Sequence, residues 1–86
     1  MDEQALLKRI SINPQIYGGT PCVRGHRIMV HQILELLGGG ISPDEICAKW
    51  FPSLKLQDIY ACIVFATQFV KNEEIHFAEE LSAAHR

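Results

Sequence analysis

The fold of this chain is decided by one stretch, Gly18-Gly19-Thr20-Pro21-Cys22-Val23-Arg24-Gly25-His26-Arg27. It separates an apolar start that favours β-structure from a long run of helical periodicity that begins at Val30. Its three glycines permit positive φ angles, and Pro21 fixes φ and removes a hydrogen-bond donor. The stretch therefore predicts a few defined turns. Because two arginines and a histidine also gather here, it is the first candidate for a binding element.

A small β element is predicted around this stretch, over residues 10–29. Ile10-Ser11-Ile12 alternates with the period of a strand and is stopped by Asn13-Pro14. Gly25-His26 lies between two short apolar runs, and glycine at the first central position is what a type II′ hairpin turn requires. Because so short a hairpin is marginal alone, we expect residues 10–12 to pair with it or with another chain. Residues 2–9 form either a short helical turn or a loose arm.

The clearest helical signal starts at Val30. Apolar side chains recur from there at intervals of three and four residues, until Gly38-Gly39-Gly40 ends the helix with a left-handed cap. Ser42-Pro43-Asp44-Glu45 then starts a second, short helix, with a serine N-cap and a proline at the first helical position. Phe51-Pro52 stops this helix. Its expected buried residues are Ile46, Cys47 and Trp50.

A third helix opens within Leu54-Lys55-Leu56-Gln57-Asp58 and keeps its apolar period as far as Val70. The sequence leaves open whether Asn72 separates it from a further helical stretch or one long helix runs through. Three helices of which the second is short are typical of a helix-turn-helix. We therefore predict one mainly α domain over residues 1–86, a three- to four-helix bundle. It consists of a short β element (10–29), a helix-turn-helix core (30–71) and a C-terminal helical extension (72–86).

Composition limits the class of protein. A chain of 86 residues is long enough for one domain, and its formal net charge of −2 argues against a strongly basic nucleic-acid binder while allowing a local basic stripe. A hydrophobic content of 48% in so small a chain indicates that some apolar surface is covered by a partner or a second copy. The three cysteines form no Cys-x-x-Cys pair, which favours free thiols in a reducing compartment. We find no signal peptide or membrane span and expect a cytoplasmic protein.

A family resemblance rests on the glycine-rich stretch and on residues spaced around it. The core pattern is Gly18-Gly19-x-Pro21-x-x-Arg24-Gly25-x-Arg27, and the match continues to about residue 70. In these residues the chain resembles the prokaryotic family called domain of unknown function 433. The further matching positions are Ile10-x-Ile12-x-Pro14-x-Ile16, Val23, Ile28, Ile33-Leu34, Leu37, Gly40-x-Ser42-x-x-Glu45-Ile46, Pro52-x-Leu54 and Asp58-Ile59.

The resemblance implies a homeodomain-like helix-turn-helix domain with a short β element in front of it. Members of the family are often encoded beside a PIN-like toxin and are regarded as antitoxins, and no enzymatic activity is established for them. The chain departs from the family pattern at three positions. His26 stands where threonine is usual, Met29 where proline is usual, and Lys55 where an N-cap threonine is usual.

Two interpretations of the basic residues in the hairpin stay open. Arg24, His26 and Arg27 contact phosphates, with the glycines bringing backbone amides close. Alternatively, Arg27 pairs with a carboxylate such as that of Glu35 or Asp44 and fixes the hairpin onto the helices.

The start of the third helix is the second candidate site. As a recognition helix it would present Lys55, Gln57 and Tyr60 to DNA, together with Asp58 and Ala61. Glutamine suits adenine, and lysine suits guanine or phosphate. The apolar run that follows favours a different role for this helix, in the core or in a dimer interface.

Metal binding and catalysis have little support in the sequence. Cys22, His26 and His31 match no zinc spacing, and no cysteine–histidine pair has an orienting acid. We expect no metal, no cofactor and no catalytic residue, and therefore no enzyme.

The sequence leads to one main hypothesis and one alternative. In the main hypothesis the chain is a non-enzymatic antitoxin-like module that forms a homodimer, binds a PIN-like toxin and also contacts double-stranded operator DNA. The alternative is a stand-alone DNA-binding transcriptional regulator without a toxin partner. The predicted DNA contacts are Arg24, Arg27, Lys55, Gln57 and Tyr60. The predicted toxin contacts lie on an acidic amphipathic stretch at Glu73, Ile75, Phe77 and Leu81.

Overall fold

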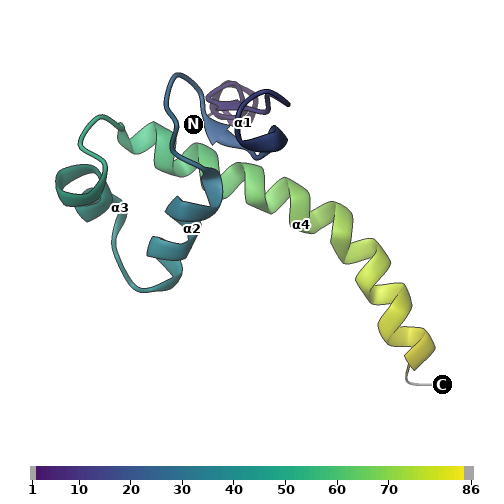
Figure 1. Cartoon of the computed structure of the whole chain (residues 1–86). Helices are drawn as coiled ribbons and strands as arrows, with labels where there is room; N and C mark the ends of the chain where they lie inside the picture. Colours follow the sequence, from purple (N-terminus) through teal and green to yellow (C-terminus); the bar gives the residue numbers. More distant parts are fainter. Residues whose placement is uncertain (1, 85–86) are drawn as a thin grey trace.

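The computed structural model describes residues 2–84, and it describes side chains for residues 2–71. Figure 1 shows a group of short elements around the N-terminal half of one long helix, whose C-terminal half extends beyond them. This mainly helical fold with a small antiparallel β element confirms the predicted fold class. In chain order the elements are α1 (Glu3–Leu7), β1 (Ile10–Ser11), the 3-10 turn η1 (Tyr17–Gly19), β2 (Cys22–Val23), α2 (Val30–Gly38), α3 (Pro43–Glu45), the π-helical turn η2 (Ile46–Trp50) and α4 (Leu56–Ala84).

The N-terminal residues form a helical turn rather than a loose arm. The Asp2 side chain accepts a hydrogen bond from the amide of Gln4, 3.2 Å away, and so caps α1. Leu6 of α1 is buried in the core. The side-chain amide of Gln68 in α4 donates to the carboxylate of Glu3, which joins the two helices at the surface.

The strands pair as expected, but the turn differs in type. β1 and β2 are antiparallel, with Ile10 opposite Val23 and Ser11 opposite Cys22, so the predicted pairing with the hairpin is confirmed for residues 10 and 11, whereas Ile12 lies outside the strand. The amide of His26 donates to the carbonyl of Val23 at 2.9 Å, which places Gly25, with φ +83°, at the second central position. That is the glycine position of a type II turn, and the predicted type II′ turn is wrong. The reason is that the next bond, from the Val23 amide to the Ile28 carbonyl, encloses four residues rather than two.

The glycines after α2 form a complete left-handed cap. Gly40 has φ +93°, and its amide donates to the carbonyl of Leu37 at 3.0 Å. The amide of Ile41 donates to the carbonyl of Leu36, also at 3.0 Å. These two bonds define a Schellman motif, which satisfies carbonyls at the helix end and turns the chain towards α3.

The second helix begins as predicted and then widens. The Ser42 hydroxyl accepts from the Glu45 amide at 3.2 Å, with Pro43 at the first helical position. From Ile46 the helix becomes a π turn, closed by a bond from the Phe51 amide to the Ile46 carbonyl at 2.7 Å. Trp50 is the last residue of this turn. The tryptophan, expected in the core, is 51% exposed.

One hydrophobic core joins the hairpin to the helices. The largest completely buried side chains come from β2, α2, η2 and α4, and they are Val23, Ile33, Ile46, Ile59 and Cys62. Helix α4 contributes to this core along its first two turns and contacts α1, β1, α2 and α3. It is therefore the central helix of the domain, as the apolar run in its sequence indicated.

Helix α4 is continuous through Asn72, which settles the question that the sequence left open. Its 29 residues correspond to a rod of about 44 Å at 1.5 Å per residue. The radius of gyration is 14.9 Å, whereas about 12 Å is typical of a compact domain of this length. Residues 72–84 of the predicted C-terminal extension are therefore the second half of α4.

Asp58 is the one buried charged side chain among residues 2–71, with 6% of its surface exposed. One carboxylate oxygen accepts from the Lys55 amide at 2.8 Å, and the other accepts from the guanidinium of Arg9 at 3.1 Å. Lysine cannot cap a helix through its side chain, so this carboxylate supplies the side-chain half of the cap of α4. The expectation that Asp58 and Ala61 would be exposed on a DNA-facing surface is wrong, since Ala61 is also completely buried.

We predict that Asp58→Ala lowers the free energy of unfolding by about 2–4 kcal/mol, because it removes both hydrogen bonds of a buried carboxylate. Asp58→Asn keeps one acceptor for the Lys55 amide and is expected to cost less. Urea denaturation followed by circular dichroism measures both. Asp44→Ala, at an exposed acid in the first turn of α3, is the control and is expected to cost less than about 1 kcal/mol. Equal losses for Asp58→Ala and Asp44→Ala would show that the buried contacts contribute nothing.

The cap of α2 provides a matched pair of substitutions. A Cβ at either Gly38 or Gly40 would meet no atom within 4 Å, so the two sites differ only in backbone conformation. Gly40→Ala forces an alanine to a positive φ and is expected to destabilise by about 1–2 kcal/mol. Gly38→Ala lies within the helix and is expected to stabilise by up to about 1 kcal/mol. Thermal denaturation measures both variants. Because one substitution is expected to lower the melting temperature and the other to raise it, shifts in the same direction would contradict the prediction.

Candidate functional site

The hairpin places its two arginines in different environments. The Nε of Arg24 donates to the carbonyl of Lys8 at 2.7 Å, and one terminal nitrogen donates to the carbonyl of Ile10 at 3.0 Å. The Arg24 amide also donates to the carbonyl of Arg9 at 2.7 Å. Arg24 therefore fastens the hairpin to the segment between α1 and β1. Contact between Arg24 and nucleic acid stays a prediction, and its guanidinium is already engaged by two carbonyls.

Arg27 has no such partner. Within residues 2–71, Arg9 is paired with Asp58 and Arg24 with carbonyls, whereas Arg27 is exposed and forms neither an ion pair nor a side-chain hydrogen bond. The suggested pairing of Arg27 with Glu35 is wrong, because the Glu35 carboxylate lies 2.8 Å from Nδ1 of His31. An ion pair between Arg27 and Asp44 is likewise absent from this part of the chain. The guanidinium of Arg27 is thus exposed and has its hydrogen-bond donors available for an external ligand.

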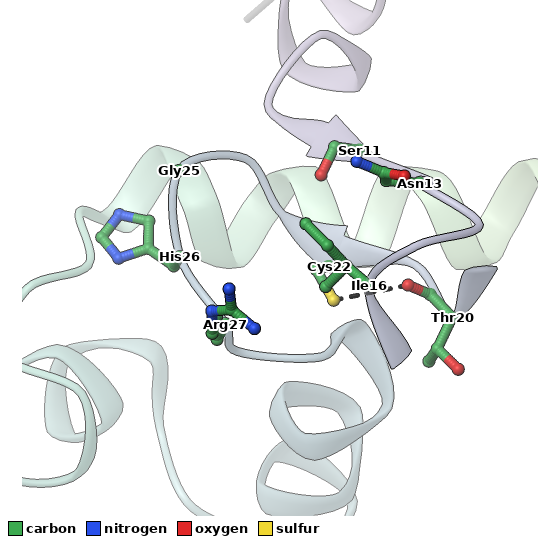
Figure 2. A pocket seen from close by; sticks show the side chains of 8 residues that line it. All are labelled: Ser11, Asn13, Ile16, Thr20, Cys22, Gly25, His26 and Arg27. Atoms are coloured by element: carbon green, nitrogen blue, oxygen red, sulfur yellow. Dashed lines mark hydrogen bonds between the residues drawn. The ribbon is translucent and has the colours of Figure 1, made fainter. Parts of the chain in front are cut away.

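Arg27 lines a small pocket between the hairpin turn and the end of β1, shown in Figure 2. The pocket has a volume of about 170 Å³. The imidazole Nδ1 of His26, at one end, lies 3.4 Å from the hydroxyl of Ser53, which belongs to the turn before α4. The pocket therefore adjoins the segment that leads into the predicted recognition helix. Its lining residues are Ser11, Asn13, Ile16, Thr20, Cys22, Gly25, His26 and Arg27.

The start of α4 presents part of the predicted DNA-facing set. Lys55 and Gln57 are exposed, and Tyr60 is half-buried against the core. Because Asp58 and Ala61 are buried, the exposed surface of this first turn is narrower than the sequence suggested. Of the residues predicted to face DNA from this helix, Lys55 and Gln57 are therefore the exposed ones.

An apolar groove lies between α2 and α4, and sequence reasoning did not identify it. Two adjoining hollows of about 310 and 390 Å³ share Leu34, Ala66 and Val70. Phe69 and Val70 on its rim are 62% and 60% exposed. The one signal in the sequence was an apolar content too high for a small chain to bury. We call this surface the α2–α4 groove; its apolar lining residues are Pro21, Val30, Leu34, Ile63, Phe65, Ala66, Phe69 and Val70.

The predicted toxin contacts lie further along the same helix. Their backbone is part of α4, beyond the short elements that surround its first half (Figure 1). Their side chains are outside the described residues. These four residues are Glu73, Ile75, Phe77 and Leu81.

Two of the three thiols, those of Cys47 and Cys62, are in environments that make them poor nucleophiles. Burial, together with the charge of Asp58, raises the pKa of Cys62 to about 12. Burial and the charges of Asp58 and Asp44 also raise the pKa of Cys47. Both thiols are therefore protonated at neutral pH, and the thiolate is the reactive form. In the described part of the chain, no three histidine, cysteine or acidic side chains are grouped closely enough to hold a metal ion.

Known proteins resemble this chain in sequence and in structure. The family model described as "Protein of unknown function (DUF433)" matches residues 10–66. An uncharacterised protein of Sinorhizobium fredii, y4eO, is 33% identical over 67 residues, which cover 77% of this chain and 30% of the relative. The chain thus spans under a third of that relative's length.

No helix within residues 2–84 is both long and apolar enough to cross a bilayer.

A solved structure agrees with these sequence matches. The crystal structure of a DUF433 member protein from Anabaena variabilis has a TM-score of 0.68 to this chain at 27% sequence identity. The similarity covers 87% of this chain and 73% of the other. With the glycine-rich hairpin, the helical core and most of the length matched, this chain belongs to the DUF433 family of proteins of unknown function.

Proposed function

We propose that this chain is a non-enzymatic, antitoxin-like module that binds a PIN-like toxin through the α2–α4 groove and the C-terminal half of α4. The observation that carries the proposal is the exposed apolar surface of the groove, which continues into an extended helix. The family resemblance supplies the class of partner. The geometry supports a protein partner because the groove is long, open and almost entirely apolar.

The extended half of α4 needs support from outside the described elements. Isolated helices of this length are marginal in water, and most helical stability in proteins comes from packing an apolar face. Residues 73–81 carry four glutamates interspersed with Ile75, Phe77 and Leu81. An amphipathic helix of this composition suits a partner groove that is apolar at its centre and basic at its rim. A toxin that acts on nucleic acid would offer a basic surface of that kind.

We expect the module to form a homodimer and to bind operator DNA as well. The observation that favours DNA is the exposure of Lys55 and Gln57 at the start of α4, which is the leading end of the helix that enters the major groove in helix-turn-helix proteins. A symmetric operator would then require two copies, each reading one half-site. A stand-alone regulator would keep this DNA-binding surface and lack the protein partner.

For the protein partner, we predict that Val70→Asp weakens binding of the PIN-like protein encoded beside this gene by more than about ten-fold, because a charge enters an apolar contact. Ile12→Asp is a matched control. Ile12 is 61% exposed and Val70 is 60% exposed, but Ile12 lies outside the groove. Co-expression followed by affinity purification and calorimetry measures both variants. Failure of the wild-type chain to bind that neighbour, or equal effects of the two substitutions, would contradict the proposal.

For DNA, we predict that Lys55→Ala weakens binding to the promoter of the gene that encodes this chain and weakens binding to unrelated DNA equally. The slope of log K against log salt concentration is expected to fall by about 1, as it does when one phosphate contact is lost. Gln57→Ala is expected to cost about 1–3 kcal/mol at one base pair only. Lys71→Ala removes the same charge about four helical turns from the start of α4 and serves as the control. Mobility-shift titrations at several salt concentrations would contradict the assignment if Lys55→Ala and Lys71→Ala behaved alike.

A further inference from the structure

We propose that the pocket beneath the hairpin turn, lined by Arg27, binds a phosphate group. This proposal can be tested separately from the toxin and DNA proposals, because binding of inorganic phosphate to the pocket is measurable without either partner. The shared chemistry is a phosphate oxyanion, whether it belongs to free phosphate and its small esters or to a nucleic-acid backbone.

The charge in the pocket is unbalanced. No aspartate or glutamate lines it, and the guanidinium of Arg27 has no carboxylate partner among the described side chains. Arg24 carries a second positive charge against the adjoining hollow, which shares Ser11, Asn13 and Gly25 with the pocket. Two guanidinium groups beside hollows that no acidic side chain lines produce a positive local potential, which favours an anion.

Neutral donors complete the lining. The side-chain oxygen of Asn13 accepts from the Gln15 amide at 2.9 Å, which leaves the amide nitrogen as the free end of this side chain. Figure 2 shows that nitrogen pointing towards Ser11, whose hydroxyl is at the same end of the pocket. Arg27 and His26 lie at the other end. Donors that approach from two sides suit the several oxygens of a phosphate better than the planar edge of a carboxylate.

The size and rigidity of the pocket limit its ligand. About 170 Å³ is well below the roughly 300–1,000 Å³ of sites that hold drug-sized molecules, so a single phosphate group fits and a whole nucleotide does not. The four-residue loop that carries Arg27, residues 24–27, is held by the bond from the Val23 amide to the Ile28 carbonyl and, within it, by the bond from the His26 amide to the Val23 carbonyl, both at 2.9 Å. A preorganised site of this kind loses little conformational entropy on binding.

The test is a titration of the isotope-labelled chain with inorganic phosphate at constant ionic strength, followed by amide chemical shifts. We expect saturable shifts at Ser11, Asn13, Gly25 and His26. Arg27→Gln is expected to weaken phosphate binding by about ten-fold or more, since it removes a charge-assisted hydrogen bond. Arg27→Lys keeps the charge and loses the planar guanidinium. Its phosphate affinity is expected to lie between those of the wild type and Arg27→Gln. Ser11→Ala, which leaves both arginines in place, is expected to weaken binding less than Arg27→Gln.

Lys71→Gln is the matched control, because it removes one exposed positive charge outside the pocket. It is expected to change phosphate affinity by less than about two-fold, as a distant screened charge does. Unchanged affinity in Arg27→Gln, non-saturating shifts, or equal shifts with acetate or chloride would each overturn the proposal. The amide spectrum of each variant without phosphate reports whether it is folded.

A second arm identifies the source of the phosphate. If a promoter duplex displaces inorganic phosphate from the wild-type pocket, the pocket takes a backbone phosphate, and Arg27→Gln is expected to lower the salt slope of duplex binding by about 1. If glycerol phosphate competes and the duplex leaves the pocket shifts unchanged, the pocket takes a free phosphate ester. If neither probe competes with phosphate, the pocket takes free inorganic phosphate and excludes its esters.

Discussion

The buried carboxylate of Asp58 is the interaction on which the arrangement of this domain depends. It accepts a hydrogen bond from the Lys55 amide at the start of α4 and another from the guanidinium of Arg9 beside β1. The carbonyl of Arg9 in turn accepts the amide of Arg24 in the hairpin. One series of contacts therefore runs from the central helix through the N-terminal segment to the turn. It fixes the pocket relative to the start of α4, although the two are far apart in the sequence.

The two arginines of the hairpin show how neighbouring positions in one turn acquire different roles. Arg24 is the first central residue of the turn, and its side chain lies back over the segment between α1 and β1, where carbonyls accept its donors. Arg27 follows the turn, and no carbonyl or carboxylate in the described part of the chain engages it. The structure gives Arg24 an architectural role, whereas a ligand-binding role for Arg27 stays a prediction. Arg24 fastens the turn to the N-terminal segment through its side chain, which leaves the side chain of Arg27 without an architectural role in the described part of the chain.

Local patterns predicted the elements well, and long-range contacts account for what they missed. The caps at Ser42 and after α2 depend on residues within a few positions, so spacing alone identified them. The burial of Trp50 was predicted from a 3.6-residue period, whereas Ile46–Trp50 forms a π turn and the tryptophan is exposed. Asp58 was assigned to the surface because its partner, Arg9, is 49 residues away. The pocket could not be predicted from local sequence patterns either, since the pairing of β1 with β2 brings Ser11 and Asn13 close to the turn.

Two of the positions at which the chain departs from the family pattern lie where the hairpin meets the helices. Met29 keeps an amide that proline would lack, and this amide donates to the side chain of Gln32 at 2.8 Å at the start of α2. His26 brings its ring to Ser53, and Thr20 lines both the pocket and the α2–α4 groove. The Thr20 hydroxyl donates to the carbonyl of Tyr17, and the Thr20 carbonyl accepts from the thiol of Cys22. The pocket and the groove thus meet at Thr20, whose hydroxyl and carbonyl are both hydrogen-bonded within the segment from Tyr17 to Cys22.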